Sequence, residues 1–414
     1  MLENFVTVPG TLERLRSGVL GEHVEGFCAA LLALGYAHVT IHRRLMVVAR
    51  LARWMDAQGV SVASLDTERV AAFTCAEQAG GTAGTACRQT LPMLLEHLGA
   101  PGRAGVTTPP EGSVASRLWF RYERYLREER GLAPATIGHH RLFVLPFMAE
   151  FALHDPSRCQ ALCSLDVRDF VLARLPGMKP NRMQALAAAL RSFLRFLFVQ
   201  GELDGDLTAA IPSVRRWRLA GTPGYLDPDE VNRLLDACEA STPRGRRDHV
   251  ILLLLARLGL RAGEVVRMEL DDLRWREGEL VVRSKGGLCD RLPLPHEVGA
   301  ALAQYLQHDR PACASRRVFI RCLAPYRGLA PSSTVSVIVR QALERASLRP
   351  AKLGGHLLRH SLASQLLRDG ASLTEIGQLL RHRSPKSTET YAKLDFTNLH
   401  DVAAPWPLTP GATP

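Results

Sequence analysis

Two stretches of the chain repeat one another, and this repeat restricts the fold more than any other feature of the sequence. LGYAHVTIHRRL (34–45) corresponds to RGLAPATIGHHRL (130–142), with Gly, Ala, Thr and Ile at matching positions. Further on, SLDTERVAAF (64–73) matches SLDVRDFVLA (164–173), and each copy ends in an apolar stretch of helical spacing. A repeat of about a hundred residues indicates a duplicated domain rather than a solenoid. We therefore predict two helical bundles.

Two stretches rich in turn-forming residues divide the 414 residues of the chain. Both interrupt the apolar periodicity with Gly, Pro and Thr, which is typical of linkers. We predict five segments: an N-terminal helical domain over 1–98, a linker over 99–115, a second helical domain over 116–205, a linker over 206–224, and a third domain over 225–414.

The third domain mixes helical and strand patterns. It begins with YLDPDEVNRLLDAC (225–238), in which Asp227 is a natural N-cap, followed by proline in the first turn and by a glutamate that completes a capping box. The apolar run at 250–256 predicts a buried helix. GELVVRSKGGLCDRLPLP (278–295) alternates like two short strands around a Lys-Gly-Gly turn. We predict a mainly helical protein whose third domain is α+β with one small sheet.

The balance of charges favours a polyanionic partner. Lys and Arg number 52 against 41 Asp and Glu, which gives a net charge of +11 and makes nucleic acid the first candidate. The nine cysteines include no C-x-x-C pair, so reduced thiols are expected. The N-terminus lacks a secretory pattern, and the longest apolar run is too short to span a bilayer. We expect a soluble, cytoplasmic protein with no membrane partner.

One motif suggests a metal at first sight. GGHLLRHSLAS (354–364) places His356 and His360 one helical turn apart, the spacing of a helical zinc-ligand pair. A zinc hydrolase of this type needs a glutamate directly after the first histidine, where this chain has Leu357. No third ligand is evident nearby. We therefore predict no metal and interpret His360 as structural support.

Six residues of the third domain together suggest a catalytic site, although none of them does so alone. Alone, Arg261 is a helix-end cation, and Tyr391 is more often a packed aromatic than a nucleophile. The set consists of Arg261 in LGLRAGEV, Lys285 at the hairpin, His356 and Arg359 in HLLRH, His382 in LLRHRSP, and Tyr391 nine residues later.

This order of residues resembles that of the tyrosine recombinase family, which includes the phage-integrase and Xer-type enzymes. The family pattern is G-L-R-x-x-E, a lysine in a β-hairpin, H-x-x-R-H, and L-L-G-H with a tyrosine nine residues beyond the histidine. The resemblance covers 225–394, and 116–205 is similar to the family's core-binding helical domain. It implies that 1–98 is a further, diverged copy of that SAM-like bundle.

The resemblance implies a site-specific recombinase that cleaves and rejoins double-stranded DNA through a 3′-phosphotyrosine intermediate, with no cofactor. It also implies a homo-tetramer, or a hetero-tetramer with related recombinases, that exchanges the segment after residue 394. The extra N-terminal domain favours integration, excision or transposition of a mobile element over chromosome or plasmid dimer resolution. Three alternatives stay open: a type IB topoisomerase, a DNA-binding module without catalysis, and an EDTA-sensitive metallohydrolase.

The phosphate chemistry explains the two arginines of the set. Attack on a phosphodiester builds negative charge on phosphorus, and a guanidinium donates forked hydrogen bonds that lysine cannot copy. The resemblance therefore implies that Arg261 and Arg359 bind the non-bridging oxygens. Glu264, at the family's acidic position, is expected to orient Arg261.

Proton transfer explains the remaining members of the set. Tyrosine ordinarily has a pKa of about 10, so the Tyr391 nucleophile needs help at neutral pH. The resemblance implies that His356 and His382 donate hydrogen bonds, and that one of them helps to take the tyrosine proton. Lys285 is expected to protonate the departing 5′ oxygen as general acid, and His360 supports the site.

The chain departs from the family pattern at one position of the motif. Arg381 stands before His382, where the family usually has glycine. It is a candidate for an additional phosphate contact. Further candidates for DNA contact are Arg43, Arg44 and Arg141.

Overall fold

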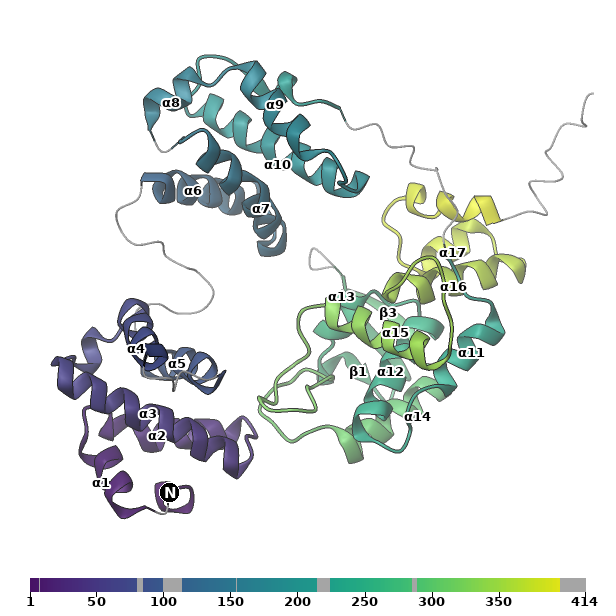
Figure 1. The fold of residues 1–414 in the computed structure, drawn as a ribbon. Helices are drawn as coiled ribbons and strands as arrows, with labels where there is room; N and C mark the ends of the chain where they lie inside the picture. Colours follow the sequence, from purple (N-terminus) through teal and green to yellow (C-terminus); the bar gives the residue numbers. More distant parts are fainter. Residues whose placement is uncertain are drawn as a thin grey trace, which may run out of the picture. The chain divides into compact units, whose positions relative to one another are not determined.

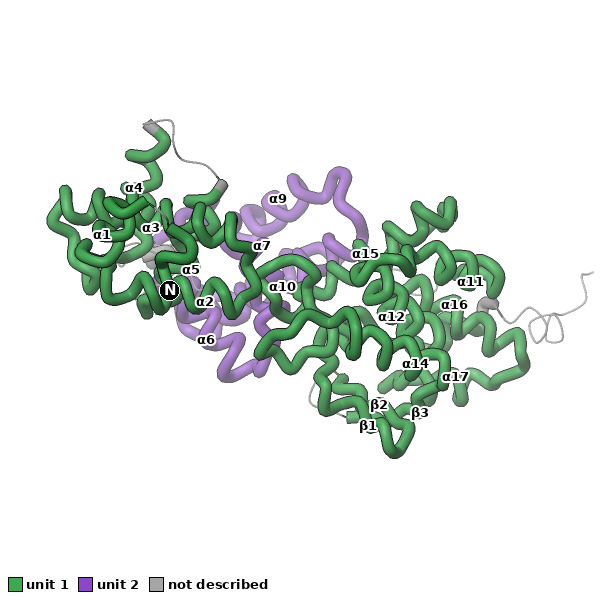
Figure 2. Tube along the Cα trace, turned by 90° about the horizontal axis from the view of Figure 1, so that it is seen from below, with its two compact units in different colours: residues 1–101, 221–414 green, residues 102–220 purple. Residues whose placement is uncertain are grey.

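A computed structural model gives the fold of the chain (Figure 1). It describes residues 1–6, 8–79, 85–99, 114–153, 155–213, 224–284 and 289–394. The chain divides into two compact units, one formed by residues 1–101 with 221–414 and the other by residues 102–220 (Figure 2). The fold is mostly helical with one small sheet, as the sequence predicts.

The N-terminal residues fold into a helical bundle around a core of their own. Its longest helix carries an apolar stripe in which Ile41, Val48 and Leu51 are fully buried, as expected for a helix packed on one face. The helix stops at Gly59, whose positive φ of 64° is the usual left-handed C-cap. The bundle consists of α1 (Pro9–Ser17), α2 (Gly21–Ala33), α3 (His38–Gln58), α4 (Thr67–Ala79) and α5 (Thr85–Leu98), with 3₁₀ turns at Leu2–Asn4 and Val62–Ser64.

The second compact unit is a helical bundle with an aromatic core. The rings of Tyr122 and Phe193 meet edge to face at 5.0 Å, and those of Phe147 and Phe170 do so at 4.8 Å. The unit consists of α6 (Val114–Arg124), a π-helix (Tyr125–Glu129), α7 (Pro134–Glu150), α8 (Pro156–Ala161), α9 (Ser164–Arg174), α10 (Pro180–Val199) and a 3₁₀ turn (Leu207–Ala210).

The repeated sequence landmarks adopt the same local structure in both bundles. Gly35 and Gly131 have positive φ values of 79° and 58°. Ala37 and Ala133 are the N-caps of α3 and α7, with nearly equal dihedral angles of −66°, 150° and −64°, 147°. Buried residues then correspond along the two helices: Ile41 with Ile137, Val48 with Val144, and Leu51 with Phe147.

The third core lies between residues 226 and 358, and α12 is its central element. Residues 250–255 of α12 are all almost completely buried, which confirms the predicted buried helix. Asp227 caps α11 within a capping box, also as predicted. The helices are α11 (Pro228–Asp236), α12 (Pro243–Arg257), α13 (Ala262–Arg267), α14 (His296–Gln304), α15 (Ser333–Arg345), α16 (Gly355–Arg368) and α17 (Leu373–Leu379). Shorter turns lie at Leu270–Asp272, Tyr305–Asp309, Pro385–Ser387 and Glu389–Leu394.

The sheet is a three-stranded antiparallel meander. The predicted hairpin is confirmed as β2 (Glu279–Arg283) and β3 (Cys289–Pro293), paired with Val281 opposite Arg291. A two-residue strand that the sequence did not indicate, β1 (Leu273–Arg274), pairs with the other edge of β2.

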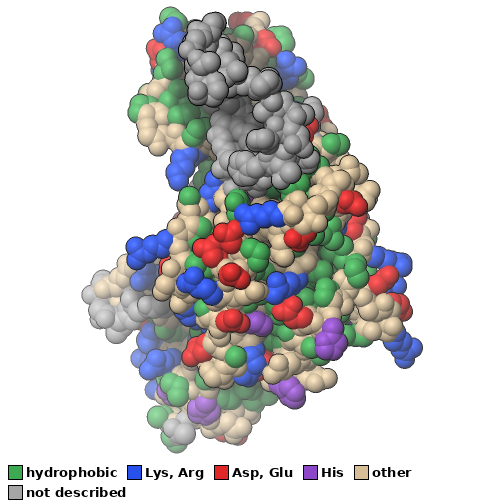
Figure 3. All heavy atoms as spheres, turned by 90° about the vertical axis from the view of Figure 1, so that its right-hand side faces the viewer, with side chains coloured by type: hydrophobic (Ala, Val, Ile, Leu, Met, Phe, Trp, Pro, Cys, Tyr) green, Lys and Arg blue, Asp and Glu red, His purple; other side chains and the backbone are tan. Residues whose placement is uncertain are grey.

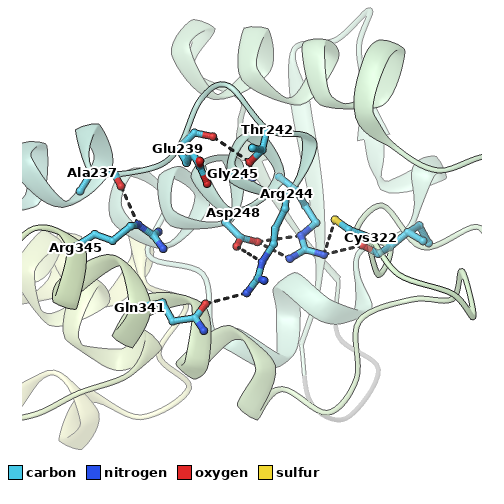
Figure 4. A network of polar contacts seen from close by, with 11 residues as sticks. Ala237, Glu239, Thr242, Arg244, Gly245, Asp248, Cys322, Gln341 and Arg345 are labelled. Carbon is cyan, nitrogen blue, oxygen red and sulfur yellow. Dashed lines mark hydrogen bonds and ion pairs between the residues drawn. The ribbon is translucent and has the colours of Figure 1, made fainter.

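A buried polar network fixes the N-terminal end of α12 (Figure 4). Arg247 donates to the Asp248 carboxylate at 2.6 and 2.9 Å, to the Ile320 carbonyl at 3.0 Å and to the Cys322 sulfur at 3.1 Å. Arg244 reaches the Asp248 carboxylate at 3.7 Å. Arg247 and Asp248 are 6% and 4% exposed, so the Arg247 charge depends on Asp248 for compensation.

Replacing Asp248 with asparagine is expected to lower the free energy of unfolding by about 2–3 kcal/mol, because it leaves the Arg247 charge buried without a counter-ion. Urea denaturation followed by circular dichroism measures this loss. Asp271→Asn is the matched control, since the Asp271–Arg316 pair is 63% and 61% exposed and exposed pairs contribute about 0–1 kcal/mol. Equal losses in the two variants would contradict the prediction.

Candidate active site

Arg261 and Glu264 are placed by the turn between α12 and α13. Arg261 is the N-cap of α13, and Glu264 closes the capping box by accepting the Arg261 backbone N–H at 2.9 Å. The Arg261 guanidinium also donates to Glu264, from Nη1 to Oε1 at 2.8 Å. Its side chain is 36% exposed, so its other donors are open to a ligand.

Arg359 is held deep in the third domain. Its Nη1 donates to the carbonyl of Gly259 and its Nη2 to the carbonyl of Leu380. Gly259 has a φ of 59°, and a Cβ there would lie 2.6 Å from a Leu380 methyl carbon, so a larger residue at this turn would be strained. Burial, together with the nearby Arg261 and Arg381 charges, lowers the pKa of Arg359 to about 10, so the guanidinium still carries its charge at neutral pH.

Tyr391 is buried, and its hydroxyl forms a hydrogen bond with a histidine. The side chain is 1% exposed and packs in a small apolar cluster with Ile376 and Leu380. Its hydroxyl lies 2.8 Å from Nδ1 of His360. Burial raises the pKa of Tyr391 to about 12, against the opposite effect of the nearby Arg359 and Arg261 charges.

The other two histidines flank this pair. The His382 ring lies parallel to the Tyr391 ring at a centroid distance of 6.4 Å, and its Nδ1 is 2.7 Å from Thr388 Oγ1. His356 lies one turn before His360 on α16, with ring centroids 6.3 Å apart. Burial lowers the pKa of both His360 and His382 to about 4, so each is neutral at physiological pH.

Arg381 lies against Glu264 rather than on the surface. Its Nη2 donates to Glu264 Oε2 at 3.0 Å, and its side chain is 5% exposed. Burial opposes ionisation of Glu264, but the hydrogen bonds from Arg261 and the charges of Arg381 and Arg261 outweigh it, so the net effect lowers the pKa of the carboxyl. The site thus contains three guanidinium groups around one carboxylate.

Lys285 lies outside the described residues, which stop at Ser284 on one side of the hairpin tip and resume at Cys289. Ser284 Oγ is 3.4 Å from Glu264 Oε1, so the root of the hairpin borders the arginine cluster. The predicted exchange segment after residue 394 is also outside the described residues.

The three candidate DNA contacts outside the third domain differ in how far they are exposed to solvent. Arg44 is 5% exposed and donates to Thr90 inside the N-terminal bundle, with its guanidinium 4.4 Å from the Tyr36 ring centroid. Arg43 on the same helix is exposed, and Arg141 on α7 is partly buried.

Metal-binding clusters and membrane-spanning helices are both absent from the residues that the structure describes. Across the described part of the chain, no cluster of three or more His, Cys, Asp and Glu side chains is arranged to hold a metal ion. Of the helices in the same part, none has the length and apolar character needed to cross a membrane.

Comparison with known proteins decides the family. Residues 224–398 match the phage integrase family. A protein of Sinorhizobium fredii (strain NBRC 101917 / NGR234) described as putative integrase/recombinase y4rA is 36% identical over 409 residues, which cover 98% of this chain and 99% of the relative. The chain belongs to the phage integrase family of tyrosine recombinases. Tyrosine recombinase XerD of Listeria innocua is 30% identical over 286 residues, which cover 67% of this chain and 94% of XerD.

Solved recombinase structures share the fold. XerH bound to a palindromic difH substrate aligns with a TM-score of 0.55 at 16% identity, over 72% of this chain and 90% of XerH. A lambda integrase (75–356) dimer bound to a COC′ core site aligns with a TM-score of 0.52 at 18% identity, over 72% and 99% of the two chains.

One contact of the site was not expected from the sequence. The sequence indicates only a supporting role for His360, whereas in the structure it is the histidine hydrogen-bonded to the Tyr391 hydroxyl. The two residues are 31 positions apart, and only the packing of α16 against the 3₁₀ turn at Glu389–Leu394 brings them together. No local pattern carries that information.

Proposed function

We propose that this recombinase cleaves double-stranded DNA by attack of Tyr391 on a scissile phosphodiester held by Arg261 and Arg359. The observation that carries the proposal is the position of the Tyr391 hydroxyl, which bonds to a neutral histidine beside two guanidinium groups. Arg359 uses two of its five N–H donors on backbone carbonyls, which leaves three for the phosphate oxygens. These donors are fixed before the substrate arrives, which is how electrostatic catalysis is most effective.

The proton balance assigns a role to His360. The Tyr391 hydroxyl gives its proton to His360 Nδ1 while the phenolate oxygen bonds to phosphorus. The bond from phosphorus to the 5′ oxygen breaks, and Lys285 supplies the proton that this oxygen needs. The 3′-phosphotyrosine keeps the energy of the broken phosphodiester, so a 5′-hydroxyl can reverse the reaction without ATP or metal.

Charge supports the second helical bundle as the partner of the third domain in DNA binding. Residues 116–205 contain thirteen Lys and Arg against nine Asp and Glu, whereas residues 1–98 contain eight against nine. Phosphate binding depends on such an excess of cations. On the face drawn in Figure 3, acidic and basic side chains are interspersed, so that face forms no continuous basic surface. We assign Arg43, Arg141 and the C-terminal segment only auxiliary roles.

The biological role that we propose is movement of a mobile element, by a tetramer on paired sites. The relative y4rA spans the whole chain, while XerD matches two thirds of it, which favours an integrase over a dimer resolvase. A lambda integrase tetramer bound to a Holliday junction aligns with a TM-score of 0.50. That likeness supports a tetramer here.

The test uses the full chain and nicked suicide duplexes from the DNA that flanks its gene, in parallel buffers with and without EDTA. The short 5′-hydroxyl fragment diffuses away after cleavage, so a covalent protein–DNA adduct accumulates. We expect an adduct whose DNA maps to the peptide that contains Tyr391. If the protein binds the DNA of both flanks but forms an adduct with neither, the proposed function is contradicted. A nick that EDTA prevents would indicate a metallohydrolase. Relaxation of plasmids that lack the site would indicate a topoisomerase.

Replacing His360 with glutamine is expected to slow single-turnover cleavage about 100-fold at neutral pH, because the amide accepts a hydrogen bond but no proton. In the unaltered chain His360 is neutral above pH 4, so its capacity as base is lost only as the pH falls through about 4. In the variant, cleavage depends on ionised tyrosine and rises about tenfold per pH unit. His308→Gln, an exposed position on the turn at Tyr305–Asp309, is the control. Parallel pH profiles for the His360 variant and the unaltered chain would contradict this role.

A further inference from the structure

Arg381 occupies a position at which the backbone favours glycine. Its φ is 53°, in the left-handed region, where a side chain with a Cβ costs free energy that glycine does not. The family pattern usually has glycine here, directly before His382. An arginine that keeps this backbone conformation therefore suggests that its side chain contributes something to the site.

The Arg381 side chain points into the arginine cluster. It is 5% exposed, and its guanidinium donates to Glu264 Oε2 at 3.0 Å and to the Leu379 carbonyl at 3.2 Å. Its Nε is buried and has no hydrogen-bond partner among the described residues. A buried cation with an unused donor is costly unless it compensates another charge.

The two carboxylate oxygens of Glu264 are shared between Arg261 and Arg381, and this arrangement indicates what Arg381 does. Oε1 of the carboxylate accepts from the Arg261 guanidinium and lies near Ser284, while Oε2 accepts from the Arg261 backbone and from Arg381. Arg261 makes a single side-chain hydrogen bond to Glu264 instead of a two-pronged fork, while Arg381 and the Arg261 backbone N–H take Oε2. The rest of its donors stay available to a ligand.

The charges lead to the same conclusion. A lone Glu264 would cancel the positive charge of Arg261 and weaken its attraction for a phosphate. Arg381 supplies a second cation to the same carboxylate, so that Arg261, Glu264 and Arg381 together keep a net positive charge. The pentacoordinate phosphorus that forms during cleavage is more negative than the starting phosphodiester, so this charge acts most strongly in the transition state.

We propose that Arg381 is a positioning residue for strand cleavage, which engages Oε2 of Glu264 and thereby leaves Arg261 free to bind the scissile phosphate. The proposal rests on the function proposed above. The hydrogen bonds of the Arg381 guanidinium go to Glu264 and to the Leu379 carbonyl, so we infer that it acts through Glu264 and Arg261.

The test compares Arg381→Gly with the unaltered chain on any duplex that gives an adduct. Glycine restores the family residue and suits the backbone. We expect cleavage to slow about tenfold on the natural phosphodiester, with DNA affinity unchanged. On a duplex with a methylphosphonate at the scissile position, which carries no negative charge, the difference between the two proteins should nearly disappear. The acid limb of the pH profile should move to higher pH in the variant, because Glu264 has lost a cation that favours its ionised form.

Arg381→Lys and Arg381→Met form a second, matched pair, since both are unbranched and only lysine is charged. The lysine variant should recover most of the cleavage rate and the methionine variant should not, which keeps the test valid if the glycine variant is unstable. An unchanged rate and pH profile in the neutral variants would overturn the proposal. So would an equal loss on the phosphodiester and the methylphosphonate, which would indicate a purely structural role. Absence of an adduct with the unaltered chain would instead contradict the proposed function.

Discussion

Replacing Tyr391 with phenylalanine is expected to abolish the covalent protein–DNA adduct, a loss of about 10⁴-fold or more in cleavage rate. The variant lacks the oxygen that attacks phosphorus. The Thr388 hydroxyl, three residues earlier, is 2.7 Å from His382 Nδ1 and belongs to that hydrogen bond. The phenyl ring can keep the packing against Ile376 and Leu380, so the fold should be retained. The measurement is the amount of adduct on a suicide duplex after denaturing electrophoresis.

Tyr305→Phe is the matched control for this prediction. Tyr305 is as deeply buried as Tyr391, at 1% exposed, and its hydroxyl accepts the Ile320 backbone N–H at 3.2 Å. The control therefore removes the same atom from an equally buried ring outside the candidate site. We expect it to form the adduct at the normal rate, and we expect Tyr391→Phe to bind the duplex with normal affinity. An adduct that persists in Tyr391→Phe would remove Tyr391 from the mechanism.

The parts of the fold that were predicted from the sequence depend on local chemistry. The start of α11 follows from the capping box at Asp227, and the hairpin follows from alternating residues around a glycine turn. The buried character of α12 follows from an unbroken apolar run. β1 has only two residues and depends on pairing with β2, so no periodicity within it could be recognised.

The candidate site shows the same division between local and long-range information. The order of residue types indicates which side chains participate, because the chemistry of phosphate and tyrosine requires them. The contacts among those side chains depend on tertiary packing. Arg359 bonds to a carbonyl 100 positions away and Arg381 to a carboxylate 117 positions away. A motif identifies the participants, while the partner of each one depends on how the helices and turns pack.

Replacing Arg359 with lysine is expected to slow cleavage about 10²- to 10³-fold, because the phosphate loses donors that are fixed in position. In the present structure one guanidinium serves the carbonyls of Gly259 and Leu380 and still has three N–H donors left. A lysine ammonium has a single nitrogen, which cannot reach both carbonyls and a phosphate at once. The lost carbonyl contacts should also lower the free energy of unfolding by about 1–3 kcal/mol.

The two effects of Arg359→Lys are separated by measuring single-turnover cleavage and urea denaturation on the same preparations. Arg345→Lys is the control, because the Arg345 guanidinium also donates to a backbone carbonyl, that of Ala237 at 2.9 Å, but lies on α15 outside the site. The control should cleave normally. If Arg359→Lys is destabilised but cleaves within about threefold of the unaltered chain, then Arg359 secures the turn at Gly259 and phosphate binding belongs to Arg261. If Arg359→Lys is equally destabilised and also loses cleavage, then the Arg359 guanidinium both joins the segments that contain Gly259 and Leu380 and binds the substrate. A role in binding phosphate would explain why this guanidinium is buried without a carboxylate hydrogen-bonded to it.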